Sequence, residues 1–218
     1  MRIATWNVNS AKQRMPRLLT WLEQRRPDVV CLQETKLGDS AFHELFDAPL
    51  ADLGYRVAHH GHGGFNGVAL LSRVGLDDVE ADFRGQPQYD GVTEARALSA
   101  TCDGVRIHSL YVPNGREVGS PHYLYKLAWL DALAAVVADG PADVALCGDI
   151  NIAPPTSTSS TRQPSSATPT SPSRNGSASR TSGWSTWCAP AGRSTRRCTP
   201  TGITGRACSI RTTGCAST

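Results

Sequence analysis

The sequence changes character at Pro155, and this change limits what the chain can fold into. Residues 155–218 contain 14 Ser, 14 Thr and 8 Arg, but no Leu, Val, Asp, Glu, Lys, Tyr or His. A segment with so few large aliphatic side chains cannot bury enough apolar surface to offset the entropy that it would lose on ordering. We therefore expect one folded region over residues 1–154 and an irregular tail after about residue 155 that forms no domain.

The net charge follows the same division. The chain has 22 basic and 19 acidic residues and a formal net charge of +3. All 19 acidic residues precede Pro155, so residues 1–154 carry 14 basic side chains and a net charge of −5, and the tail carries +8. The positive balance belongs to the tail and does not indicate a nucleic-acid-binding patch on the folded region.

Apolar runs and helical patterns alternate along residues 1–154. Leu18, Leu19 and Leu22 recur at helical spacing, and Pro27 marks the end of that helix. The expected strands are Met1–Trp6, Asp28–Leu32, Gly67–Leu71, Ala97–Cys102, Val105–Leu110 and Val144–Leu146, and the expected helices are Arg14–Arg25 and Tyr123–Ala138. This alternation predicts an α/β fold whose chemistry lies in the loops that follow the strands.

The seven cysteines fall into two groups. Cys31, Cys102 and Cys147 lie singly in apolar runs, which is typical of buried free thiols. The other four are Cys188, Cys198, Cys208 and Cys215, which lie in the tail. They lack CxxC spacing and a nearby His, so we expect no zinc site there. Because neither a signal peptide nor an apolar run of membrane length is present, we expect a reducing cytoplasm and no membrane partner.

Four polar clusters stand where expected strands end. They are TWNVNS at Thr5–Ser10, LQETK at Leu32–Lys36, YVPNG at Tyr111–Gly115 and GDINIAP at Gly148–Pro154. Glu34 offers a carboxylate and Asn7 an amide oxygen, and both are ligands that suit Mg²⁺. Asp149 can accept a proton from an attacking water, and Asn151 can donate to a phosphate oxygen. A metal ion with an aligned carboxylate can hydrolyse a phosphodiester.

Each cluster alone also has an ordinary structural explanation. A single Glu after a strand is commonly a solvated loop residue, and an Asp-x-Asn turn commonly caps local backbone groups. Tyr111 with Pro113-Asn114-Gly115 makes a good turn, and Asn66-Gly67 is typical of a tight hairpin turn. Outside the four clusters, the HHGHGG run at His59–Gly64 has the composition of a metal-binding tract, but it matches none of the four motifs. The occurrence of four clusters in order favours the catalytic interpretation.

The clusters resemble those of one enzyme family. WNVNS, QETK, NGVALLSR (Asn66–Arg73), YVPNG and GDINIAP occur in the same order in the exonuclease III family of abasic-site endonucleases, within the endonuclease/exonuclease/phosphatase superfamily. The PHYLYKLAWLDAL stretch at Pro121–Leu133 is similar to bacterial members. The resemblance covers Met1–Pro154 and implies a four-layer α/β sandwich, which is incomplete here because the second half is lost.

The resemblance also implies roles for particular residues. Asn7 and Glu34 resemble the magnesium-site residues of the family, and Asp149 and Asn151 belong to the same expected metal site. Tyr111 resembles the active-site tyrosine near the scissile phosphate, Asp149 the proton acceptor or donor, and Asn151 the residue that stabilises the transition state. The implied cofactor is Mg²⁺ or Mn²⁺.

The implied reaction acts on DNA. It is incision 5′ to an abasic site together with 3′→5′ exonuclease action, and the implied partner is duplex DNA with abasic sites or 3′ ends, bound by a monomer. The aspartate of a RID-type segment and the final Asp-His pair of the family are absent from the sequence, so we expect this chain to be inactive as written.

The tail is consistent with a shifted reading frame. If each codon combines the last two bases of an intended codon with the first base of the next, Thr156–Pro164 (TSTSSTRQP) corresponds to DVDVFDPAA. Under the same rule Gly183–Cys188 gives GLVDVV, and Thr199–Ser217 gives HTYWDYRAGMFHQDYGMRID. These strings resemble the segments that follow GDxNIAP in the exonuclease III family. We interpret the tail as out of frame near Pro154–Thr156, rather than as an ordinary disordered Ser/Thr/Arg-rich linker.

Two other functions compete with the DNA-repair nuclease. One is another phosphodiesterase or phosphatase of the superfamily, such as an inositol-phosphate phosphatase or a sphingomyelinase, because the WNVNS, QETK and GDxN segments are shared widely there. The other is a non-catalytic protein that holds phosphates with a disordered basic tail. The YVPNG and NGVALLSR segments favour the DNA-repair branch.

Overall fold

The computed structural model describes residues 1–152 and 206–209. Within them lie the helices α1 (Ala11–Arg25), α2 (Asp39–Asp52) and α3 (Pro121–Ala138), and the strands β1 (Arg2–Asn7), β2 (Val29–Gln33), β3 (Arg56–His60), β4 (Val68–Ser72), β5 (Asp77–Ala81), β6 (Ala97–Cys102), β7 (Val105–Tyr111), β8 (Val144–Asp149) and β9 (Arg206–Ser209). None of the described helices has the length and apolar character needed to cross a membrane.

The strands form two mixed sheets. The first sheet has the order β3-β4-β2-β1-β9, and the second has the order β5-β6-β7-β8. Each sheet contains one parallel pair, β1 with β2 in the first and β7 with β8 in the second. The other neighbours are antiparallel. The carboxyl ends of the two parallel pairs carry four of the five predicted site residues.

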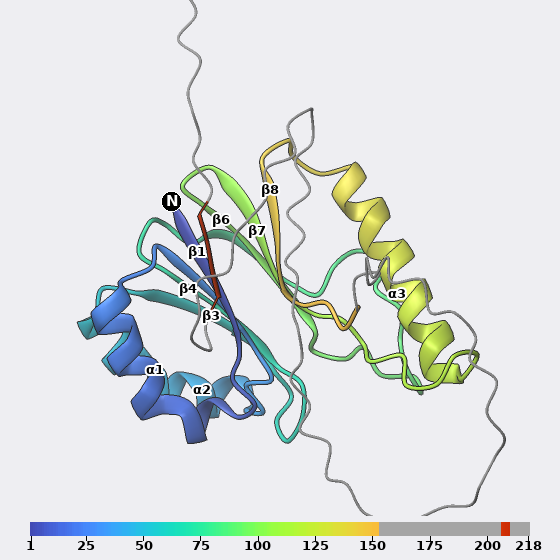
Figure 1. The fold of residues 1–218 in the computed structure, drawn as a ribbon, viewed down its shortest axis with the longest axis horizontal. Coiled ribbons are helices and arrows are strands. Elements are labelled where there is room, and N and C mark those ends of the chain that lie inside the picture. Colours follow the sequence, from blue (N-terminus) through green and yellow to red (C-terminus); the bar gives the residue numbers. More distant parts are fainter. Residues whose placement is uncertain (153–205, 210–218) are drawn as a thin grey trace, which may run out of the picture. The chain divides into compact units, whose positions relative to one another are not determined.

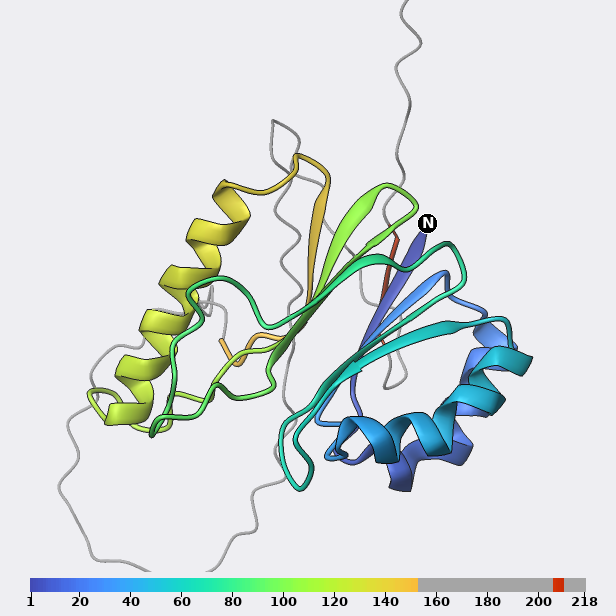
Figure 2. The same ribbon diagram turned by 180° about the vertical axis from the view of Figure 1, so that it is seen from behind.

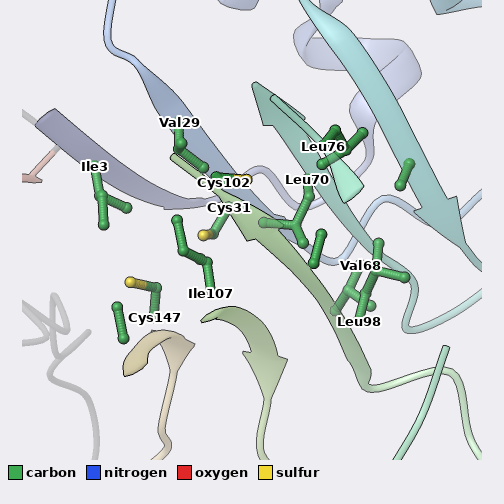
Figure 3. Packing of buried hydrophobic residues seen from close by; sticks show 13 residues of the cluster. Ile3, Val29, Cys31, Val68, Leu70, Leu76, Leu98, Cys102, Ile107 and Cys147 are labelled. Carbon is green, nitrogen blue, oxygen red and sulfur yellow. The ribbon is translucent and has the colours of Figure 1, made fainter. Parts of the chain in front are cut away.

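The sheets face each other across a shared core. Ile3, Val29 and Leu70 of the first sheet pack in one buried cluster with Leu98 and Ile107 of the second (Figure 3). Alternate residues of β1, β2 and β4 face α1 and α2, which cover the outer side of the first sheet, and alternate residues of β6 and β7 face α3, which covers the outer side of the second (Figures 1 and 2). The predicted α/β sandwich with helices outside two sheets is therefore confirmed for the described residues.

The prediction of three buried free thiols is confirmed. Cys31 and Cys147 lie in the core between the sheets together with Cys102. A hydrogen bond with the Cys147 thiol, together with burial, raises the pKa of Cys31 well above its usual value, so this side chain stays protonated. The four tail cysteines, and the expectation that they hold no zinc, lie outside the side chains that the structure describes.

The expectation of an irregular tail needs one correction. Arg206–Ser209 forms β9, which pairs antiparallel with β1 (Figure 1). The physical reason is that β1 would otherwise be an edge strand with unpaired backbone groups, and an extended segment of almost any composition can satisfy them. The remaining tail residues lie outside the described part, as does the proposed change of reading frame.

Candidate active site

Strand ends bring the five predicted residues together. Asn7 is the last residue of β1, and Glu34 directly follows β2, which runs parallel to β1. Tyr111 and Asp149 are paired at the ends of the parallel strands β7 and β8, and Asn151 follows two residues later. Because both parallel pairs end at the same side of the packed sheets, residues far apart in the sequence meet there.

Asn7 links the two sheets at this side. Its Nδ2 donates to Glu34 Oε1 at 2.7 Å and to Asp149 Oδ2 at 2.9 Å. Two oxygens that both lie within 2.9 Å of one nitrogen are at most about 6 Å apart, so both can reach one ion or one water. The carboxylates of Glu34 and Asp149, which lie 115 residues apart in the sequence, are therefore neighbours in the fold.

Glu34 is held as a carboxylate by three donors. Besides Asn7, Tyr111 donates its hydroxyl hydrogen to Oε1 at 3.0 Å, and Lys36 Nζ lies 3.2 Å from Oε2. Burial alone would raise the pKa of Glu34, but the hydrogen bonds from Asn7, Lys36 and Tyr111 outweigh it and lower the pKa. Burial and the neighbouring negative charge of Glu34 raise the pKa of Tyr111, which keeps its proton as a donor.

Asp149 has the opposite balance. Its side chain is buried, and burial raises the pKa of this carboxyl despite the hydrogen bonds from Asn7 and from the Asn151 backbone N–H at 3.1 Å. The nearby charge of Glu34 raises it further. The neighbouring carboxyls of Glu34 and Asp149 therefore have pKa shifts in opposite directions, lowered for Glu34 and raised for Asp149.

Asn151 is fixed by two further hydrogen bonds. Its Nδ2 donates to Val112 O at 2.9 Å, and Lys126 Nζ of α3 donates to Asn151 O at 2.5 Å. The residue has a positive φ of 51°, which is uncommon for a side chain other than Gly. Lys126, which sequence reasoning did not select, therefore helps to hold the strained end of the GDIN segment.

The donor set fits a magnesium ion. Among residues 1–152 no group of three His, Cys, Asp or Glu side chains converges as a metal cage, but Mg²⁺ is commonly bound through one or two carboxylates and keeps several waters. Glu34 and Asp149 meet that need. The Asn7 amide turns its NH₂ group to both carboxylates, and its oxygen accepts from Asn9 N at 3.1 Å, so in this arrangement Asn7 orients the carboxylates.

The His59–Gly64 run does not form a metal-binding tract. His59 Nδ1 lies 2.8 Å from Asp39 Oδ1 and its Nε2 lies 2.8 Å from Thr35 Oγ1. Burial lowers the pKa of His59 to about 4, so the neutral ring donates to Asp39 and accepts from the Thr35 hydroxyl. His60 instead pairs with Asp82 at 3.1 Å.

The loop that carries Glu34 is strained and pinned. Glu34 and Lys36 have positive φ values of 54° and 56°, and Thr35 between them is fully buried. The Thr35–His59 hydrogen bond ties this loop to β3. Sequence reasoning missed His59 in this role, although a buried polar ring at a strand end is a usable signal once its partner is known.

Asn66-Gly67 is not the tight hairpin turn that the sequence suggested. Seven residues separate the paired ends His60 and Val68 of β3 and β4. Asn66 and Gly67 have the left-handed φ values of such a turn, 55° and 86°. Their backbone oxygens instead accept from Lys36 N and Thr35 N, and Gly67 N donates to Ala95 O. The pair therefore joins neighbouring loops of the site.

Replacing Gly67 with Ala should lower the free energy of unfolding by about 1–3 kcal/mol more than replacing Gly64 with Ala. Both glycines have positive φ, 86° and 76°. An added Cβ at Gly67 would meet Thr35 Oγ1 at 2.2 Å, whereas one at Gly64 meets nothing within 4 Å. Urea denaturation of the two variants measures the difference. Equal losses would show that Thr35 is not held at this position.

Comparison with known proteins identifies the family. The model of the endonuclease/exonuclease/phosphatase family matches residues 4–206. The chain belongs to this family. As a family member it is 29% identical over 157 residues to the exodeoxyribonuclease of Bacillus subtilis, an alignment that covers 70% of this chain and 59% of that protein.

Solved structures of family members agree. The 3′ phosphatase NExo from Neisseria, solved with product DNA hairpin, superposes with a TM-score of 0.66 at 35% identity, covering 72% of this chain and 60% of that one. The AP endonuclease from Archaeoglobus fulgidus gives a TM-score of 0.64 at 34% identity, covering 72% and 59%. This chain thus spans about three-fifths of the length of these relatives.

Proposed function

We propose that this family member is a divalent-metal-dependent DNA-repair phosphodiesterase that incises duplex DNA at abasic sites and removes nucleotides from 3′ ends. The observation that carries the proposal is the single Asn7 amide that holds the carboxylates of Glu34 and Asp149 within reach of one another, beside the Tyr111 hydroxyl. The names of the relatives, which include an exodeoxyribonuclease and an AP endonuclease, support the choice of DNA as substrate.

Glu34 and Asp149 would hold the Mg²⁺ ion. When bound, such an ion neutralises charge on the phosphate oxygens and orients the phosphodiester. The lowered pKa of Glu34 suits this role because the side chain stays ionised. Mn²⁺, which also takes oxygen ligands, is expected to replace Mg²⁺.

The remaining steps belong to protein side chains. Asp149 is buried at the end of β8, and its carboxylate would accept a proton from the attacking water. The backbone N–H of Asn151 and the Asn7 amide fix its two oxygens in direction. Tyr111 donates to Glu34 here, and it would stand beside the scissile phosphate. The side-chain amide of Asn151 would donate to a phosphate oxygen as charge builds there.

A test of the function needs the frame-restored protein, by which we mean the product of the gene read in the shifted frame after Pro154 up to its stop codon. It is incubated with a 5′-labelled duplex that carries one abasic analogue, with an undamaged duplex that has a recessed 3′ end, and with an inositol phosphate. We expect cleavage 5′ to the abasic analogue and stepwise shortening of the recessed strand, both with Mg²⁺ or Mn²⁺ and neither with EDTA. Release of phosphate from the inositol phosphate with both DNA substrates intact would overturn the proposal in favour of a phosphatase.

A further inference from the structure

Arg96 contacts Tyr111 in three separate ways. Arg96 directly precedes β6, and Tyr111 ends the neighbouring antiparallel strand β7. The backbone oxygen of Arg96 accepts from Tyr111 N at 2.7 Å, and its Nη1 donates to Tyr111 O at 3.2 Å. Its guanidinium also lies over the Tyr111 ring, with Cζ 4.9 Å from the ring centroid. Backbone and ring of the tyrosine are therefore both held by one residue.

Glu94 fixes the guanidinium in turn. Arg96 Nε donates to Glu94 Oε2 at 2.8 Å, and Nη2 donates to Oε1 at 3.3 Å. The two side chains are 12% and 14% exposed, so the ion pair is largely shielded from solvent and its geometry is restricted. A fork that donates to one carboxylate through two nitrogens has much less rotational freedom than a single contact.

Asn66 completes the link to the Glu34 loop. Its Nδ2 donates to Glu94 Oε1 at 2.9 Å, and its backbone oxygen accepts from Lys36 N at 3.0 Å. Gly67 N donates to Ala95 O at 3.0 Å in the same connection. The NGVALLSR segment, to which the proposed chemistry gives no role, thus connects the loop that carries Glu34 to the segment that carries Arg96.

We propose that Arg96, fixed by Glu94, is a positioning residue that holds the phenol of Tyr111 toward Glu34. The proposal rests on the proposed function, because Tyr111 matters for rate only if the site cleaves phosphodiesters. A ring with a free side-chain torsion would sample orientations in which its hydroxyl leaves Glu34 Oε1. The cation over the ring and the two backbone hydrogen bonds select the orientation that the structure shows.

The test compares variants of Arg96 with a matched control. Arg96→Met removes the charge and keeps much of the length of the side chain. Arg96→Lys keeps the charge but loses the guanidinium that donates to Glu94 through two nitrogens. The control is Arg106→Met at the start of β7, because Arg106 is 14% exposed and also pairs with a glutamate, Glu80, at 2.8 Å. It lies five residues from Tyr111 on the same strand, about 17 Å away.

Two readouts are measured. The first is kcat and KM for incision of the abasic duplex by the frame-restored protein. We expect Arg96→Met to lower kcat about tenfold with KM within about twofold, Arg96→Lys to recover part of that loss, and Arg106→Met to leave kcat within about twofold. A rise in KM with kcat unchanged would overturn the proposal. An equal fall of kcat in Arg106→Met would also overturn it, because loss of a shielded ion pair would then explain the effect.

The second readout does not depend on activity. Tyrosine labelled with ¹³C at Cζ reports the hydrogen bond of each hydroxyl, and Tyr111→Phe assigns the signal of Tyr111. The 218-residue chain and the frame-restored protein are measured in parallel. We expect Arg96→Met to move or broaden this signal and Arg106→Met to leave it in place. An unmoved signal in Arg96→Met overturns the positioning role, whereas absence of DNA cleavage by the unmutated frame-restored protein overturns the proposed function and leaves this readout to decide the positioning.

Discussion

Replacing Asp149 with Asn in the frame-restored protein should lower kcat for incision about a thousandfold and leave the affinity for abasic duplex within about threefold. The amide keeps the shape of the side chain but cannot accept the proton of the attacking water, and loss of a general base typically costs a hundredfold to ten-thousandfold in rate. Incision rates are measured under single-turnover conditions with Mg²⁺. Affinity for the duplex is measured by fluorescence anisotropy with Ca²⁺ in place of Mg²⁺.

Glu34→Ala is expected to give a loss of similar size that excess Mn²⁺ partly reverses, because the proposed role of Glu34 is to hold the ion. Asp143→Asn serves as the control, since Asp143 is exposed and directly precedes β8, at the opposite end of that strand from Asp149. If binding fell as far as rate in both Asp149→Asn and Glu34→Ala, the two residues would be structural, and the assignment of the site would be wrong.

The positions of these side chains could be predicted because they depend on strand ends. Asn7, Glu34, Tyr111 and Asp149 each stand at or just beyond the last residue of an apolar run, and a parallel pair brings such ends together. The hydrogen bonds among them could not be predicted. Whether Asn7 turns its oxygen or its NH₂ to the carboxylates depends on the backbone N–H of Asn9, which only the folded turn places within reach.

The residues that support the site were missed for a related reason. Glu94 and Arg96 are two charged residues before an apolar strand, and nothing in their spacing distinguishes a shielded pair under Tyr111 from an exposed one. His59 and Asp39 are 20 residues apart and meet because α2 packs beside β3. Contacts of this kind are decided by tertiary packing, which local sequence pattern does not encode.

Four elements of the fold were also missed, with different causes. Helix α2 contains Pro49 and several acidic residues, which obscured the helical spacing of Phe42, Phe46 and Leu50 on its buried face. β3 is short and rich in histidine. β5 (DDVEA) is exposed along its length, so it shows no alternation, and its pairing with β6 comes from backbone groups. β9 likewise depends on the open edge of β1 rather than on side-chain pattern.

The 218-residue chain should incise abasic duplex at less than one-thousandth of the rate of the frame-restored protein. Residues 155–218 contain no His and no acidic residue, so they supply no counterpart of the Asp-His pair that the exonuclease III resemblance calls for. Loss of one member of a catalytic group that acts as a unit costs several orders of magnitude in rate. The proposed Mg²⁺ ligands Glu34 and Asp149 are present in both proteins, so the comparison isolates the contribution of the segment after Pro154.

Packing should reinforce this difference. Besides cysteine, the large apolar side chains of residues 155–218 are Ile203, Ile210, Trp184 and Trp187. The shifted frame replaces this segment with strings such as GLVDVV and WDYRAGMF, which carry the aliphatic and aromatic side chains that bury surface at roughly 25 cal/mol per Å². We therefore expect the 218-residue chain to unfold at lower urea concentration and to aggregate more readily.

Side-by-side incision assays with Mg²⁺ and with EDTA, on equal amounts of monomeric protein from size-exclusion chromatography, separate lost chemistry from lost solubility. Incision by the 218-residue chain within tenfold of the frame-restored rate would show that residues 1–154 suffice for the reaction, and the change of reading frame would then have no bearing on function.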